Sequence, residues 1–210
     1  MRRGLFALGA IIGTALAGWS PIALPATAPG TILVLGDSIS AEYGLPRDSG
    51  WVKLLGDRLK EQHLDYSVEN ASISGETTGG GLARLPELLQ RVRPAVVIVE
   101  LGANDGLRGL AIDVAHDNLA AIVRAAEAAH ARVLVVGMQL PPNYGPDYTQ
   151  RFAAMFADVA SRYHTALVPG LLNDFGARRD LFQEDGLHPT AAAQPHLRDE
   201  VWEKLLPLLR

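Results

Sequence analysis

A serine, an aspartate and a histidine in this sequence stand in patterns suited to nucleophilic catalysis. Residues 36–40 read Gly-Asp-Ser-Ile-Ser, and a serine such as Ser38 becomes a nucleophile when a neighbouring base takes its proton. At the start of a helical turn, free backbone N–H groups would also favour a developing oxyanion. The segment is not a G-x-S-x-G elbow, because Ser40 stands where the second glycine should be. Alternatively, Asp37 or Ser38 merely caps a helix, and this segment alone leaves both interpretations open.

The segment 185–189, Asp-Gly-Leu-His-Pro, provides a matching base. Asp185 lies three residues before His188 and can reach its Nδ1–H, which leaves Nε2 to face a serine. Pro189 disfavours helical geometry at His188 and should hold the histidine in a loop. The alternative is a surface turn with a solvated histidine, but aspartate, glycine and proline together favour a defined turn.

Two middle segments, residues 72–75 and 102–105, contain possible oxyanion donors. A tetrahedral oxyanion needs two or three fixed hydrogen-bond donors, which the Gly75 amide and the Asn104 side chain could supply beside the Ser38 amide. Glycine suits this position because no Cβ obstructs the approach of substrate to the backbone. Asn104 could instead be a turn residue that bonds its own backbone.

Short apolar runs alternate with longer helical patterns along the chain and would position these segments. We expect strands at residues 31–35, 66–71, 95–101, 132–138 and 166–168, and helices at 51–62, near 81–92, and at 112–130, 148–163 and 190–209. This alternation predicts an α/β fold, with a parallel sheet covered by helices on both faces. Reactive groups gather beyond the carboxyl ends of such strands, and each of the four segments directly follows a predicted strand or the loop after one.

The composition indicates one compact domain over residues 29–210. The chain has 210 residues and no cysteine, so it has no thiol nucleophile, no disulfide and no cysteine-based metal site. Its formal net charge of -4 argues against nucleic acid as a partner.

Residues 1–28 have the pattern of a signal peptide. Arg2 and Arg3 precede an uncharged apolar stretch at residues 4–17, and small residues at 15–17 or 26–28 offer cleavage sites. The apolar stretch is shorter than the roughly 20 residues that span a bilayer, although an uncleaved anchor is an alternative. We therefore expect a periplasmic or secreted protein without a stable membrane span.

Taken together, the four segments resemble the four sequence blocks of the SGNH (or GDSL) hydrolase superfamily. Residues 70–77, 81–86, 100–109, 140–141, 143–145 and 185–189 are similar to the bacterial multifunctional thioesterase I/protease I/lysophospholipase (arylesterase) group. The likeness covers nearly everything from residue 31 onward. Two departures from the group's usual sequence are Ala103, where glycine is common, and Pro142, where alanine is common.

The resemblance implies a three-layer α/β/α fold with a flavodoxin-like sheet of five parallel strands. It implies an exported, cofactor-free serine hydrolase that cleaves carboxylic esters and thioesters, such as aryl esters, acyl thioesters and lysophospholipids. The partner would be a small acyl substrate, and we expect a monomer. The implied roles are Ser38 as nucleophile, His188 as general base and acid, Asp185 as its orienting carboxylate, and Gly75 and Asn104 as oxyanion donors. In that group the loop at residues 106–110 lies over the acyl site, which makes Leu107, Leu140 and Pro141 candidates for the lining of an acyl pocket.

Two other functions compete with this interpretation. Asp113, His116 and Asp117 have the spacing of one helical face and could bind a catalytic metal, although a solvated surface is the more common outcome. A non-catalytic binding protein that retains the sheet is a further alternative, because fold alone does not guarantee activity.

Overall fold

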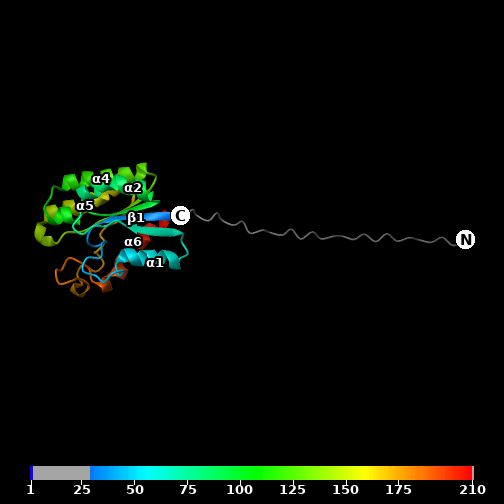
Figure 1. The fold of residues 1–210 in the computed structure, drawn as a ribbon. Coiled ribbons are helices and arrows are strands. Elements are labelled where there is room, and N and C mark those ends of the chain that lie inside the picture. Colours follow the sequence, from blue (N-terminus) through cyan, green and yellow to red (C-terminus); the bar gives the residue numbers. More distant parts are fainter. Residues whose placement is uncertain (2–28, 210) are drawn as a thin grey trace.

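The computed structural model describes residues 1 and 29–209, and residues 29–209 form a single sheet covered by helices on both faces (Figure 1). Apart from residue 1, the predicted signal peptide lies outside the described residues. The sheet contains five parallel strands in the order β2-β1-β3-β4-β5. Their bounds are β1 Gly30–Gly36, β2 Tyr66–Asn70, β3 Val96–Glu100, β4 Arg132–Val136 and β5 Ala166–Val168. The predicted three-layer, flavodoxin-like fold is confirmed.

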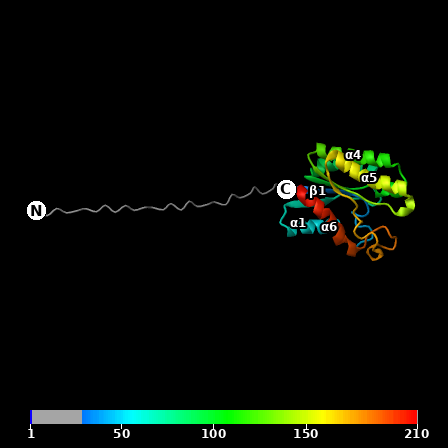
Figure 2. The same ribbon diagram turned by 180° about the vertical axis from the view of Figure 1, so that it is seen from behind.

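The helices divide between the two faces. Helices α2 (Thr78–Val92), α4 (Ile112–Ala128) and α5 (Pro146–Tyr163) cover one face, and α1 (Trp51–Glu61) packs with α6 (Gln194–Leu205) on the other (Figures 1 and 2). Both layers bury apolar side chains against the central strands; every residue of β3 is buried. None of the helices in the described part of the chain has the length and apolarity needed to cross a membrane.

Several element boundaries differ from the sequence-based expectation for local reasons. Helix α2 begins at Thr78, before the predicted residue 81, because Thr77 caps it by accepting a hydrogen bond from the Gly80 amide at 3.2 Å. A short helix, α3 (Ala103–Leu107), begins within the segment that carries Asn104 and extends into the predicted loop at 106–110.

The predicted closing helix at residues 190–209 is not continuous. It consists of a 3₁₀ turn at Ala191–Ala193, helix α6, and a second 3₁₀ turn at Leu206–Leu209. Pro207 lies in the second turn, and its missing N–H removes a bond that a continuing α-helix would need.

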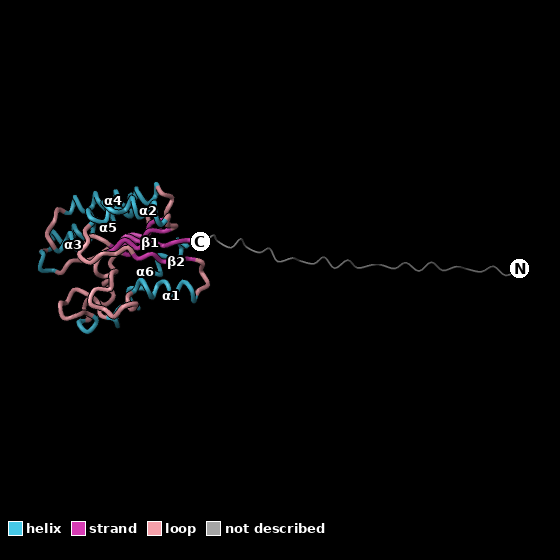
Figure 3. The backbone as a smooth tube through the Cα atoms, viewed as in Figure 1, coloured by secondary structure: helices cyan, strands magenta, loops and turns pink. Residues whose placement is uncertain are grey.

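The strand order places β1 between β2 and β3, so the chain leaves β1 at the point where the winding direction of the sheet reverses. In open parallel sheets this switch point forms a crevice at the carboxyl ends of the strands. The loops after the strands lie at this end of the sheet, and the first described strand residues and the C-terminus lie at the opposite end (Figure 3). The fold therefore collects the polar segments that follow β1, β2 and β3 at one edge.

Two glycines differ in how closely neighbouring atoms surround them: Gly137 lies at this edge of the sheet and Gly56 lies in helix α1. A Cβ added at Gly137, just after β4, would lie 2.6 Å from the backbone oxygen of Pro169, whereas one at Gly56 in α1 would have only an ordinary contact at 3.8 Å. We expect Gly137→Ala to lower the free energy of unfolding by about 1–3 kcal/mol through overpacking. Gly56→Ala should raise it by about 0.5–1 kcal/mol through helix propensity. Urea denaturation of both variants measures the contrast, and equal effects would contradict the packing described.

Candidate active site

Ser38 lies in a tight turn directly after β1. The Ala41 amide donates to the Asp37 carbonyl at 2.9 Å, and the Tyr43 amide donates to the Ser38 carbonyl at 3.1 Å, so the chain doubles back at this point. A Cβ at Gly36 would lie 2.7 Å from Ser40 Oγ, and only glycine fits where the strand enters the turn. The turn leaves Ser38 partly exposed at the wall of a cavity.

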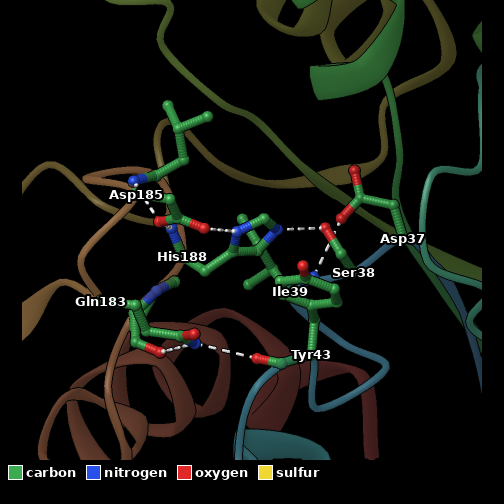
Figure 4. A network of polar contacts seen from close by, with 9 residues as sticks. Asp37, Ser38, Ile39, Tyr43, Gln183, Asp185 and His188 are labelled. Carbon is green, nitrogen blue, oxygen red and sulfur yellow. Dashed lines mark hydrogen bonds and ion pairs between the residues drawn. The ribbon is translucent and has the colours of Figure 1, made fainter.

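The structure brings Ser38, His188 and Asp185 together in a line (Figure 4). His188 Nε2 lies 2.8 Å from Ser38 Oγ, and His188 Nδ1 lies 2.7 Å from Asp185 Oδ2. These distances are within hydrogen-bonding range although 150 positions separate the serine from the histidine. With Nδ1–H donated to the aspartate, Nε2 is free to accept the serine proton.

The turn at residues 185–188 holds Asp185 for this role. The amides of Leu187 and His188 donate to Asp185 Oδ1 at 2.9 and 3.0 Å, and Gly186 adopts a left-handed φ of 69°. Partial burial opposes ionisation of Asp185, but these two amides and the His188 ring outweigh it and lower its pKa to about 2. The carboxylate is therefore ionised and fixed at neutral pH.

Two residues that sequence reasoning missed hold the histidine from the other side. The Tyr43 ring lies 4.5 Å from the His188 ring, centroid to centroid, at an angle of 39°. Gln183 Nε2 donates to the backbone oxygens of Tyr43 at 2.9 Å and Pro189 at 3.1 Å, which joins the serine turn to the histidine loop (Figure 4). No spacing signal links these segments, because they meet only when the sheet has folded.

The three predicted oxyanion donors line the same cavity as the triad. Its volume is about 1020 Å³, and Ser38, Gly75 and Asn104 all contribute to its wall. Within the described residues, the backbone N–H groups of Ser38 and Gly75 donate to no acceptor. Gly75 has a φ of 80°, a conformation that glycine adopts without strain. Unpartnered donors at the wall of a cavity are the arrangement that a negatively charged oxygen requires.

Buried carboxyl groups connect the segments that carry these donors. Asp105 is 4% exposed and accepts hydrogen bonds from the Thr78 amide at 2.9 Å and the Thr78 hydroxyl at 2.6 Å. This contact ties the segment of Asn104 to the helix that follows Gly75. The relative position of these two predicted donors therefore depends on a side chain that the sequence analysis gave no role.

Asp37, which precedes Ser38, and Glu100, which ends β3, are two further buried acidic residues. Each side chain is 1% exposed. Burial raises the pKa of Asp37 to about 6, against the opposing effect of the hydrogen bond from the Ile39 amide. Burial, reinforced by the nearby charge of Asp37, raises the pKa of Glu100 well above its usual range. Two adjacent carboxyl groups are thus held where ionisation of both is unfavourable.

The apolar part of the cavity lies beside α3 and the end of β4. Leu107, Leu140 and Pro141, the residues considered for an acyl pocket, all line it together with Ala103 and Met138. Leu140 is 8% exposed, and the Leu107 carbonyl accepts a hydrogen bond from the Tyr144 hydroxyl at 2.9 Å. This wall is therefore fixed to the structure rather than part of a free loop.

The alternative metal site is not assembled. Asp113 pairs with Arg151 at 2.9 Å, and the two ring nitrogens of His116 contact Asp117 and Asp158 at 3.2 and 2.8 Å. Over residues 29–209, no three histidine, aspartate or glutamate side chains are placed to hold a metal ion together. These residues therefore form surface ion pairs and hydrogen bonds on α4 and α5.

The sequence pattern of the GDSL-like Lipase/Acylhydrolase family matches residues 34–194, which include all four segments and the triad. The chain belongs to this family. It is 52% identical to Esterase TesA of Pseudomonas aeruginosa over 85% of this chain and 89% of that protein. It is 40% identical to Thioesterase 1/protease 1/lysophospholipase L1 of Escherichia coli K12 over 88% and 87% of the two chains. The crystal structure of TesA has a TM-score of 0.83 and covers 85% of this chain and 99% of its own. The resemblance inferred from the sequence is confirmed, and with it the classification as an SGNH hydrolase.

The raised pKa of Asp37 predicts a pH-dependent stability difference. In the folded protein this carboxyl keeps its proton up to about pH 6, whereas in the unfolded chain it loses the proton near pH 4. Since the folded state binds more protons in this window, the contribution of Asp37 to stability is present below pH 4 and decreases as pH rises through 6. Relative to wild type, Asp37→Asn should therefore gain unfolding free energy on the order of 2 kcal/mol between pH 4 and pH 7. Urea titrations at several pH values measure this, and a difference that is constant with pH would contradict the assignment.

Proposed function

We propose that Ser38 is the nucleophile of an esterase and thioesterase, with His188 as general base and acid and Asp185 as its orienting group. The observation that carries this proposal is the continuous hydrogen-bonded line from Asp185 through His188 to Ser38 at the wall of the cavity. The same wall carries the unpartnered amides of Ser38 and Gly75 and the side chain of Asn104. Nucleophile, base, orienting group and oxyanion donors are thus all within one cavity.

The geometry supports a two-step acyl transfer. Ser38 Oγ attacks the carbonyl carbon as its proton passes to His188 Nε2, and the carbonyl oxygen becomes an oxyanion beside the amides of Ser38 and Gly75 and the Asn104 side chain. The bond to the leaving oxygen or sulfur then breaks, and His188 returns its proton to the leaving group. Water attacks the acyl-Ser38 ester in the same way, which releases the acid and restores the serine.

The cavity supports carboxylic esters and thioesters as the substrate class. Its leucine and proline side chains on one wall offer apolar contact, and relatives of this chain are named esterase, arylesterase, and thioesterase and lysophospholipase. The chemistry is common to these substrates, because each presents a carbonyl carbon with an oxygen or sulfur leaving group. No cofactor has a role in the steps described.

Replacement of Ser38 tests the nucleophile. We expect Ser38→Ala to lower kcat/KM for p-nitrophenyl esters by roughly 10⁴-fold or more, because no other group can form the acyl-enzyme. The variant should also lose labelling by a fluorophosphonate, which reacts with an activated serine, while its thermal unfolding stays close to that of wild type.

Ser74→Ala is the matched control, because Ser74 lines the same cavity but has no histidine beside it. It should retain fluorophosphonate labelling and turnover, and treatment of the wild type with a chelator should leave activity unchanged. Labelling that persists in Ser38→Ala and disappears in Ser74→Ala would identify Ser74, and not Ser38, as the nucleophile.

The apolar wall predicts a dependence on acyl length. Truncation in Leu107→Ala removes contact with the alkyl chain, and each buried methylene is worth about 0.8 kcal/mol, or roughly fourfold in kcat/KM. We expect the variant to lose more activity on eight-carbon than on two-carbon p-nitrophenyl esters. Leu110→Ala is the control, since Leu110 is 44% exposed and does not line the cavity. An equal loss for both esters would exclude Leu107 from the acyl pocket.

We further propose that residues 1–28 are a signal peptide and that the protein acts as a monomer in the periplasm or medium. The charged start, the short apolar stretch and the small residues after it support export. N-terminal sequencing of the protein from cytoplasmic and exported fractions, followed by light scattering of the purified form, tests both statements. An intact N-terminus found only in the cytoplasm would contradict export, and a scattering mass of two chains would contradict the monomer.

A further inference from the structure

The side chain of Asn104 is already bound on one side before any substrate arrives. Its Nδ2 donates a hydrogen bond to Asp37 Oδ2 at 3.1 Å, and Asn104 is partly exposed at the wall of the cavity. A planar amide nitrogen carries two N–H groups, so one bond to a carboxylate leaves the second in a fixed direction. A carboxylate accepts but does not donate when ionised, so it also selects the nitrogen rather than the oxygen of the amide for this side.

Asp37 has little freedom to move. Its other carboxyl oxygen, Oδ1, accepts a hydrogen bond from the Ile39 amide at 3.1 Å, and its own amide donates to Glu100 Oε2 at 3.3 Å. Both sides of its carboxyl group are therefore engaged, one by the serine turn and one by Asn104. The residue immediately before Ser38 thus links the serine turn to the segment that carries Asn104.

Glu100 anchors this arrangement to the sheet. It is the last residue of β3, and its Oε2 accepts hydrogen bonds from the Asp37 amide and from the Ser40 hydroxyl at 2.6 Å. These contacts lie on either side of Ser38 in the sequence, so a single buried side chain holds both ends of the serine turn.

The acidic pair is unfavourable for folding on its own. Buried carboxyl groups lose solvation, and an apolar pair of similar volume often gives equal or greater stability. Here the Asp37 carboxyl lies close enough to Glu100 to affect its ionisation, and among the described residues neither carboxyl takes part in a salt bridge. What they provide is geometric, because together they fix two polar segments, the serine turn after β1 and the segment of Asn104 after β3.

We propose that Asp37 is a positioning residue for the oxyanion hole: it directs the free N–H of Asn104 toward the oxygen that becomes charged during acyl transfer, and Glu100 holds Asp37 in place. This inference rests on the proposed function, since it assumes that Asn104 contacts the oxyanion. In this role Asp37 affects catalysis only through the Asn104 side chain. Asp37 itself contacts no reacting atom.

A double-mutant cycle separates this role from a general structural one. Asp37→Ser places a hydroxyl where it can still accept the Ile39 amide but is too short to reach Asn104. We expect it to lower kcat roughly 10- to 100-fold with KM changed less than about threefold, and Asn104→Ala to lower kcat by roughly 10²–10³-fold. The double variant should be no slower than Asn104→Ala, because the side chain on which Asp37 acts is already absent. Losses that multiply in the double variant would overturn the proposal.

Gln183→Ala is the matched control. It also removes a side chain that holds the serine turn, but its hydrogen bonds go to the carbonyl oxygens of Tyr43 and Pro189 on the histidine side and not to Asn104. Its effect should therefore multiply with that of Asn104→Ala. If Gln183→Ala is as non-additive as Asp37→Ser, the coupling belongs to the whole region and the specific role of Asp37 is contradicted.

Inhibitor binding supplies an independent readout. A trifluoromethyl ketone reacts with the serine hydroxyl and forms a tetrahedral adduct with a negatively charged oxygen. The matching methyl ketone forms little of this adduct and binds mainly without a covalent bond. Asp37→Ser should weaken the first at least tenfold and leave the second within about twofold; equal weakening of both would overturn the proposal. If Asp37→Ser does not fold, Asp37→Asn is used for both experiments, because its amide can present a donor to the Asn104 donor and disrupt the same contact.

The wild type and Ser38→Ala are measured first, since they test the proposed function separately. Wild-type turnover in Ser38→Ala would contradict the proposed function itself. Loss of turnover in Ser38→Ala, together with effects of the Asp37 and Asn104 substitutions that multiply, would contradict only the positioning role of Asp37.

Discussion

A parallel sheet places the carboxyl ends of all its strands at one edge, and every polar group of the candidate site is attached to that edge. Ser38 follows β1, Gly75 follows β2, Asn104 follows β3, and the loop with Asp185 and His188 follows β5. These residues are far apart in the sequence, but strand pairing with fixed register determines where each segment begins. The hydrophobic core therefore does more than stabilise the fold, because it sets the distances on which a proton transfer between side chains depends.

Strand pairing alone leaves the polar loops free to adopt several arrangements, and buried carboxyl groups restrict them. Glu100 fixes the serine turn to β3, while Asp105 fixes the segment of Asn104 to the helix after Gly75. Acceptors with several lone pairs are well suited to join two or three donors from different segments. The desolvation of these carboxyl groups lowers stability, and this loss is tolerated because the segments they join carry the proposed nucleophile and oxyanion donors.

The fold and the residues of the candidate triad could be predicted because each has a local signal in the sequence, and the segments taken together favoured a catalytic role over a helix cap or a surface turn. An apolar strand followed by Gly-Asp-Ser, and an Asp-x-x-His turn before a proline, each lie within ten residues. The contact of Tyr43 with His188 has no such signal, since it requires Gln183 to join two loops that only the folded sheet brings together. Helix α3 was missed because its glycine at position 106 argues against a helix, whereas the packing of Gly106 against Phe152 and Leu140 requires a residue without a side chain.

The two sides of the cavity are built from different kinds of contact, and this division bears on substrate choice. On the oxyanion side, the walls come from α3 and the segment after β4, and hydrogen bonds such as that from Tyr144 to the Leu107 carbonyl hold them. On the histidine side, Tyr43 and Phe182 line the cavity together with Arg179, which begins a 3₁₀ turn (Arg179–Leu181). In the proposed mechanism His188 returns its proton to the leaving group, which places the leaving group on this second side. The same mechanism places the acyl chain against the wall that contains helix α3 and the leaving group against the wall built from loops and a short 3₁₀ turn, which favours selectivity for acyl length together with tolerance of different leaving groups.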